Sequence, residues 1–369
     1  MGVFRESKGV VSRQGQAQRP AGTYEDQYSR HGFAGDQAML YRRHPATAWA
    51  RIEGDFRNTV ADVRELELPD ATDPRALPTK LMYNDDVAVY ASRRSEPMPF
   101  YYRNADGDDL IFVQRGTGRL TTDFGPLDFQ AGDYLAVPKG ITYRLEPDSR
   151  DNIFYFVQTT GPLGFPERGL LGQYVPFDYG VLRTPEPRPA EDADGGEGAE
   201  WEVVVKRGDR LSSIFYPFDP FDVVGWQGST APFKLSMYDI RSISAERLDI
   251  PPSGYTTFTA PGCLICTFTP RPMQSDPDSS FVPPYHRNVD YDEIAFVVGT
   301  EGEQAGAGPR DGTLYLNPQG AHHGPDANPF SSAERPERFT TYLLNIDVER
   351  PLTITSAYES HARDQQEQA

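Results

Sequence analysis

The stretch PYHRNVDYDEIAFV at residues 284–297 repeats the pattern of FYYRNADGDDLIFV at residues 100–113. Both copies carry an Arg-Asn pair, two aspartates and a phenylalanine at the same places. A second match joins GTLYLNPQGAHH at 312–323 to GDYLAVPKGITY at 132–143 through a shared glycine, proline and glycine. Two matches in the same order predict an internal duplication.

Each copy lies in a region of short runs rich in Val, Phe, Tyr and Ile, separated by Gly, Asp and Pro. Such runs fill residues 81–160 and again 201–358, and helical periodicity is scarce. Many short strands at close spacing are typical of a β-sandwich or β-barrel. The sequence therefore predicts an all-β protein.

The domain organisation follows from changes in composition. Residues 183–200 (RTPEPRPAEDADGGEGAE) are acidic and rich in Pro and Gly, which predicts a linker or long exposed loop. We expect 1–182 to hold an N-terminal arm and a first barrel, and 201–369 to hold a second barrel. Residues 1–54 are polar and irregular, so we expect an arm that lies on a domain or on a neighbouring subunit.

Composition limits the classes of partner. The formal net charge of −18 disfavours binding to nucleic acid or to anionic membranes. No apolar run reaches about 20 residues, and the polar N-terminus has no apolar signal core, which predicts a cytoplasmic protein. Cys263 and Cys266 form a lone CxxC within a strand-like run, which favours two core cysteines over a redox pair.

Candidate metal ligands concentrate in the second copy. His286, Glu293 and the pair His322 and His323 supply imidazole and carboxylate groups, the ligand types of a two-histidine, one-carboxylate iron(II) site. Asp292 competes with Glu293, but strand alternation turns it to the opposite face. We expect His286 and Glu293 to come from adjacent strand segments and the second histidine to come from the far side of the barrel.

The first copy lacks these ligands. Tyr102, Asp109 and Tyr143 stand opposite His286, Glu293 and His323. Two phenols and one carboxylate would bind iron(II) poorly, so we expect the first barrel to be a metal-free scaffold.

Several motifs point to a known family. PQGAHH at 318–323 resembles the PxGxxH motif of the cupin superfamily. HRN at 286–288, HGPD at 323–326, FDVVGW at 221–226 and the early AGTYEDQYSRHGFAG and LYRRHPAT stretches within 21–47 occur in the order seen in homogentisate 1,2-dioxygenases. The chain thus resembles that family over most of its length.

This resemblance implies a bicupin, that is, two small jelly-roll barrels of which only the C-terminal one binds Fe(2+). It selects His323 over His322 as the ligand beside His286 and Glu293, which leaves His322 as a substrate-facing or supporting group. It also implies oxygen-dependent cleavage of a hydroxylated aromatic ring, with both atoms of O2 entering the product, and a homo-oligomer built on trimers.

Two departures from the family bear on the substrate. Tyr255 stands where these dioxygenases place a histidine near the substrate hydroxyl, and residues 297–304 offer no counterpart of a family tyrosine. A phenol is a poor general base at neutral pH. We therefore expect a homogentisate- or hydroquinone-like substrate, with Tyr255 and His322 as candidate catalytic residues. The alternatives are a metal-dependent cupin of the isomerase type and a non-catalytic bicupin.

Overall fold

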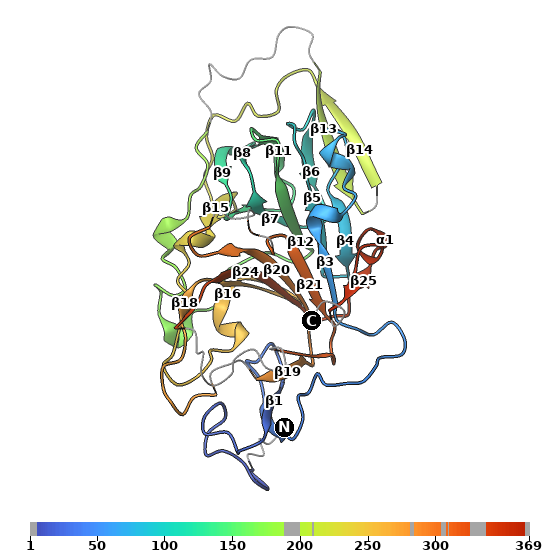
Figure 1. Cartoon of the computed structure of the whole chain (residues 1–369). Helices are drawn as coiled ribbons and strands as arrows, with labels where there is room; N and C mark the ends of the chain where they lie inside the picture. Colours follow the sequence, from blue (N-terminus) through green and yellow to red (C-terminus); the bar gives the residue numbers. More distant parts are fainter. Residues whose placement is uncertain are drawn as a thin grey trace.

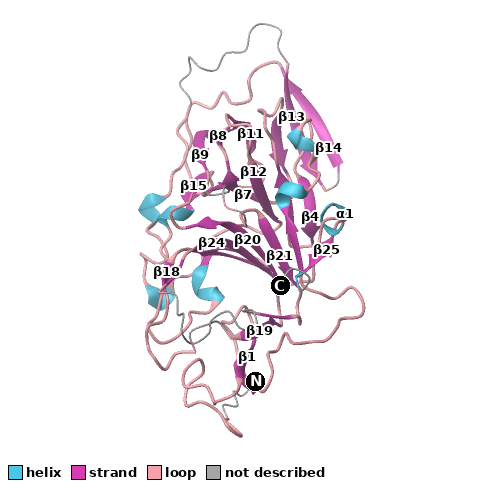
Figure 2. Ribbon diagram, in the orientation of Figure 1, coloured by secondary structure: helices cyan, strands magenta, loops and turns pink. Residues whose placement is uncertain are grey.

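The computed structural model describes residues 6–187, 200–208, 210–280, 284–303, 308, 310–324 and 337–365. The described chain is almost entirely strands and loops, as predicted (Figure 2). Its one α-helix, α1 at Ser356–Glu359, is a single turn, and the remaining helical pieces are short 3-10 turns. No helix in the described part is both long and apolar enough to cross a lipid bilayer.

Two sheets form the first barrel (Figure 1). The seven-stranded sheet has the order β15 (Phe233–Ser236), β10 (Asp133–Val137), β7 (Asp108–Arg115), β12 (Ile153–Thr159), β5 (Val87–Ser92), β4 (Thr79–Tyr83) and β25 (Thr353–Ile354). The six-stranded sheet has the order β14 (Arg210–Tyr216), β13 (Trp201–Arg207), β6 (Tyr101–Asn104), β11 (Thr142–Pro147), β8 (Thr117–Thr122) and β9 (Gly125–Gln130).

The second barrel pairs another seven-stranded sheet with a smaller one. The larger sheet has the order β16 (Thr256–Ala260), β17 (Cys263–Phe268), β24 (Thr341–Val348), β20 (Asp292–Thr300), β21 (Thr313–Asn317), β3 (Thr59–Asp62) and β26 (Arg363–Asp364). The smaller sheet has the order β2 (Gln37–Arg42), β1 (Tyr24–Ser29), β19 (Tyr285–Asn288) and β22 (His322–His323). A two-stranded ribbon joins β18 (Arg271–Pro272) to β23 (Arg338–Phe339).

Strand alternation assigns the side chains of the repeated strands β7 and β20 to two faces. In β7, Ile111 belongs to the apolar cluster inside the first barrel, whereas Phe112 belongs to a larger core shared by both barrels. Phe296 of β20 joins the same shared core, and Glu293 lies on the opposite face of its strand. The duplicated pattern thus places one face of each central strand between the barrels and the other face inside its own barrel.

The contact between the barrels is a continuous apolar layer. The rings of Tyr155 and Phe296 lie 4.0 Å apart between centroids, and both side chains are fully buried. Polar contacts also cross the layer: the Gln114 amide donates to the Val298 carbonyl at 2.8 Å, and the hydroxyls of Tyr134 and Thr267 are 2.8 Å apart. Full burial of a large apolar side chain contributes about 1.5–3 kcal/mol, so this layer stabilises the two barrels as one body.

The strand pairing crosses the proposed division at residues 183–200. β13, β14 and β15 follow that segment in sequence but pair with first-barrel strands, whereas β3 precedes it and pairs with β21 of the second barrel. Residues 188–199 lie outside the described part of the chain. The domain boundaries remain a prediction. Each barrel includes strands that lie on the other side of these boundaries in the sequence.

Cys263 and Cys266 lie on β17, are free thiols and are buried, as expected for core cysteines. Burial raises the pKa of both thiols. Neither group therefore has the exposed, thiolate-forming surroundings of a redox pair.

Candidate metal centre

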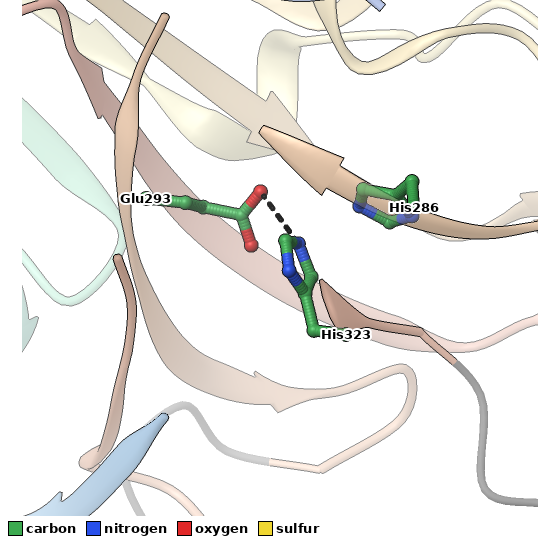
Figure 3. A group of neighbouring side chains, drawn as sticks. All are labelled: His286, Glu293 and His323. Carbon is green, nitrogen blue, oxygen red and sulfur yellow. Dashed lines mark ion pairs between the residues drawn. The ribbon is translucent and has the colours of Figure 1, made fainter. Parts of the chain in front are cut away.

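The three predicted ligands come together inside the second barrel (Figure 3). His286 lies on β19 and stands directly opposite His323 on the antiparallel strand β22. Glu293 lies on β20, which belongs to the larger sheet, and points toward the two imidazoles. The predicted placement was therefore wrong in one respect: the two histidines share a sheet and the carboxylate comes from the other one.

The distances fit a single small ion. One ligand atom from each residue lies within 4.8 Å of the others. The imidazole rings of His286 and His323 are 4.1 Å apart between centroids, and His323 Nε2 lies 3.6 Å from Glu293 Oε2. His286 and Glu293 are partly exposed, whereas His323 is buried.

Backbone carbonyls fix which ring nitrogen of each histidine is free. His286 Nδ1 lies 3.0 Å from the Pro284 carbonyl, and His323 Nδ1 lies 3.2 Å from the Ala321 carbonyl. Because a carbonyl only accepts, Nδ1 carries the proton and Nε2 keeps its lone pair. The buried Nε2 of His323 has no hydrogen-bond partner among the described residues, as expected for an atom that binds a metal.

Two asparagines hold the carboxylate in place. Asn288 Nδ2 donates to Glu293 Oε2 at 3.2 Å, and Asn317 Nδ2 donates to Oε1 at 3.0 Å. Such supporting hydrogen bonds orient metal ligands in proteins. Sequence reasoning missed Asn317, and only the repeated HRN motif marked Asn288.

The pKa values of the three candidate ligands favour the binding of a cation. Burial opposes the charge of Glu293, but the charge of the neighbouring His323 outweighs it and lowers the pKa of this carboxyl to about 2. Burial and the neighbouring His323 lower the pKa of His286 to about 4, so its imidazole is neutral at pH 7. Burial also works to lower the pKa of His323, but Glu293 raises it above its usual value. A metal ion would replace that proton.

Asp292 is excluded as a ligand by its own contacts. Its carboxylate accepts hydrogen bonds from the backbone N–H groups of Gln319 and Leu352, at 2.8 Å and 2.7 Å. Asp108 of the first barrel accepts from the backbone of Lys139 and Leu163 in the same way. The two aspartates are thus equivalent structural residues, and the preference for Glu293 is consistent with this geometry.

His322 lies on the opposite face of β22 from His323. Its Nε2 is 2.7 Å from Arg287 Nη1 and 3.3 Å from Asp26 Oδ2, and Asp26 is also bound by Arg42. The structure therefore places His322 in an ionic cluster with the N-terminal arm and not beside the three candidate ligands.

Tyr255 is also placed by other partners. It ends a 3-10 turn at Pro252–Tyr255, is 2% exposed, and packs on Phe268 with the Arg271 guanidinium 4.7 Å from its ring centroid. Burial raises the pKa of its phenol to about 12, although Arg271 opposes the shift. A catalytic role for Tyr255 stays a prediction.

The N-terminal arm adds a residue that the motif analysis did not single out. β1 pairs in parallel with β19, so that Gln27 stands beside His286, and the arm lies on the second barrel of its own chain. The Phe33 ring meets the His286 ring edge-on at 5.1 Å and is 6% exposed. The arm therefore covers one side of the candidate metal site formed by His286, Glu293 and His323.

The first barrel contains the counterpart group that the repeat predicts. Tyr102 and Tyr143 pack edge-on with centroids 5.4 Å apart, as His286 and His323 do in the second barrel. Tyr143 donates to Asp109 at 3.2 Å, and Asn104 donates to Asp109 at 2.7 Å, which matches the bond from Asn288 to Glu293. The two sites share one architecture with different side chains.

Comparison with known proteins supports the relationship that the motifs indicated. Residues 76–240 match the family described as Homogentisate 1,2-dioxygenase N-terminal. A Saccharolobus solfataricus protein named "Putative dioxygenase" is 29% identical over 313 residues, covering 82% of this chain and 80% of that protein. Homogentisate 1,2-dioxygenases from Bradyrhizobium diazoefficiens and Nitrobacter hamburgensis are each 30% identical, over 73% and 68% of this chain.

The chain spans less than two thirds of the length of these homogentisate dioxygenases, 61% and 56% respectively. Among solved structures, a Bacillus subtilis oxalate decarboxylase is similar with a TM-score of 0.37 at 12% identity, over 85% of this chain and 82% of that one.

This chain is a bicupin, because it consists of two jelly-roll barrels, and the second of them holds a candidate metal site. It is a relative of the homogentisate 1,2-dioxygenases, and the resemblance seen in the sequence motifs is thereby confirmed.

Proposed function

We propose that this chain is a non-haem iron(II) dioxygenase that cleaves the ring of a hydroxylated aromatic compound. The observation that carries the proposal is the convergence of two free imidazole Nε2 atoms and one ionised carboxylate inside the second barrel. Such a donor set would suit iron(II) that also binds ligands from the substrate and dioxygen. The names of the relatives support oxygen chemistry at such a site.

Each residue has a distinct part in this proposal. Bound iron(II) would supply a site that activates an aromatic hydroxyl and dioxygen together. His286, His323 and Glu293 would hold the ion, and Asn288 and Asn317 would keep the carboxylate in its orientation. Phe33 shields the edge of His286 from water.

The buried tyrosine favours a substrate other than homogentisate itself. With a pKa of about 12, Tyr255 donates a hydrogen bond at neutral pH but does not take up a proton. General acid–base assistance is worth about 10²–10⁴-fold in rate. We propose a phenol or hydroquinone as the substrate, whose hydroxyl would need no general base from Tyr255. We also propose a homo-oligomer built on trimers.

An oxygen electrode with a panel of substrates tests the proposal. With a panel of substituted hydroquinones, gentisate and catechols, we expect oxygen uptake with a related phenol or hydroquinone at a kcat/KM well above the value for homogentisate. We also expect Tyr255→Phe to turn over more slowly while its thermal midpoint shows that it folds. If homogentisate is the best substrate and Tyr255→Phe is fully active, the assignment of Tyr255 is wrong. If no compound drives oxygen uptake in the iron-loaded protein, an isomerase-type or binding bicupin is favoured.

A further inference from the structure

The first barrel contains a partly open pocket of about 70 Å³ at its counterpart of the candidate metal site. Tyr102, Asp109 and Tyr143 line it, and Lys206 and Gln158 complete its polar wall. Lys206 comes from β13, which pairs in parallel with the Tyr102 strand β6. In the second barrel β1 pairs in parallel with β19 as β13 does with β6, and Ser29 stands opposite Asn288 where Lys206 stands opposite Asn104. The first barrel therefore has other side chains in place of the candidate metal ligands, and a cation and hydrogen-bonding groups line its pocket.

Two of these polar groups have unused hydrogen-bonding capacity. Tyr102 is 7% exposed, and among the described residues its hydroxyl has no hydrogen-bond partner. The oxygen of the Gln158 amide accepts from Lys206 Nζ at 2.9 Å and from the Tyr90 hydroxyl at 3.3 Å, which leaves its N–H groups as donors. The Tyr102 hydroxyl and the Gln158 N–H groups belong to residues that line the pocket and have no acceptor among the described residues, which points to a ligand with acceptor atoms.

The carboxyl group that lines the pocket is also unusual. Burial raises the pKa of Asp109 to about 7, and Asp108 adds to the shift, although Asn104, Lys206 and Tyr143 oppose it. The protonated form of Asp109 is a third donor. Asp109 and an incoming carboxylate would then share one proton, as close pairs of carboxyl groups do.

We propose that this pocket binds a small monocarboxylic acid, held by Tyr102, Gln158 and Asp109 through its carboxyl oxygens, with Lys206 as the nearest cation. The size of the space sets the size of the acid. The space of about 70 Å³ is roughly half of a cavity that binds benzene, about 150 Å³, so a carboxyl group with a methyl group suits it better than an aromatic ring. Met98 and Phe156 supply the apolar wall against which a methyl group packs.

The surrounding charges explain why a proton must accompany the acid. Lys206 Nζ is paired with Asp106 at 2.6 Å, and the carboxylate of Asp108 is bound by the backbone N–H groups of Lys139 and Leu163. One lysine therefore does not compensate both an ionised Asp109 and a carboxylate ligand. Binding should be constant below the pKa of Asp109 and weaken above it, by about tenfold between pH 6 and pH 8.

Titration calorimetry of the iron-loaded full chain with sodium acetate at pH 6 tests this site, with sodium chloride at equal ionic strength as the reference titrant. We expect one saturable site per chain with a Kd on the order of 1 mM. Tyr102→Phe should weaken the binding of acetate roughly tenfold, because a hydrogen bond to a charged group is lost. Lys206→Met should weaken it as well. Tyr174→Phe, which removes a hydroxyl from an exposed ring, is the matched control and should bind acetate normally.

The site is independent of the proposed oxygen chemistry, and the variants separate the two. Acetate bound at the iron would be affected by Glu293→Ala and not by Tyr102→Phe. The proposal is overturned if acetate gives no heat beyond that of chloride, if the affinity is the same at pH 6 and pH 8, or if neither Tyr102→Phe nor Lys206→Met changes it.

Discussion

Replacing His323 by alanine is expected to reduce the iron content from about one ion per chain to background. The mutation removes one of three donor atoms, and its Nε2 is the buried atom that has no partner among the described residues. His286→Ala and Glu293→Ala should have the same effect, since two remaining donors hold iron(II) weakly. Metal analysis of the purified variants measures the result, and turnover should fall with the iron content.

Two matched variants serve as controls for iron loss. Asp292→Asn keeps the shape of the competing carboxylate and should retain iron, because its oxygens bind backbone N–H groups. Tyr143→Phe changes the first-barrel counterpart of His323 and should also retain iron. Iron that disappears in Asp292→Asn but remains in Glu293→Ala would show that the strand register is wrong by one residue. Iron loss in a folded Tyr143→Phe would make the first barrel a metal site.

Truncation of Phe296 to alanine should destabilise the whole chain by roughly 3–5 kcal/mol, as for other buried aromatic side chains. The side chain is fully buried between the barrels and packs on Tyr155. Because both barrels lose part of a shared core, we expect one cooperative unfolding transition that moves to lower urea concentration. Circular dichroism and tyrosine fluorescence should report the same midpoint.

Phe215→Ala provides the comparison for this stability measurement. Phe215 lies on β14 and is 56% exposed, so its removal should change the free energy of unfolding by at most about 0.5 kcal/mol. Two separate transitions, of which Phe296→Ala shifts only one, would contradict a shared core.

The sequence predicted those parts of the fold that depend on local patterns. Alternation along residues 100–113 and 284–297 separates Asp109 and Glu293 from Asp108 and Asp292, and the structure confirms that the two aspartates differ in role from their neighbours. The repeat also aligned Tyr102 and Tyr143 with the two histidines, and in the structure the tyrosine rings meet as the histidine rings do. These inferences need only the period of a β-strand.

The sequence could not predict features that depend on pairing between distant segments. β1 of the arm pairs with β19, and β25 near the C-terminus pairs with β4 of the first barrel. The residue pattern of a strand does not identify the strand with which it pairs. The same limit explains the misplaced His323, since its sheet follows from the pairing of β22 with β19. Phe33 is a site residue only because of such a pairing.

We propose that the three candidate ligands of the second barrel support the insertion of both atoms of dioxygen into an aromatic compound. Mass spectrometry of the product formed by the iron-loaded protein under ¹⁸O₂ tests it most directly, with the substrate that gives the fastest oxygen uptake. We expect a ring-opened product that carries two ¹⁸O atoms, and no such product from His323→Ala. A product with the elemental composition of the substrate, or one that takes its oxygen from water alone, would contradict a ring-cleaving dioxygenase.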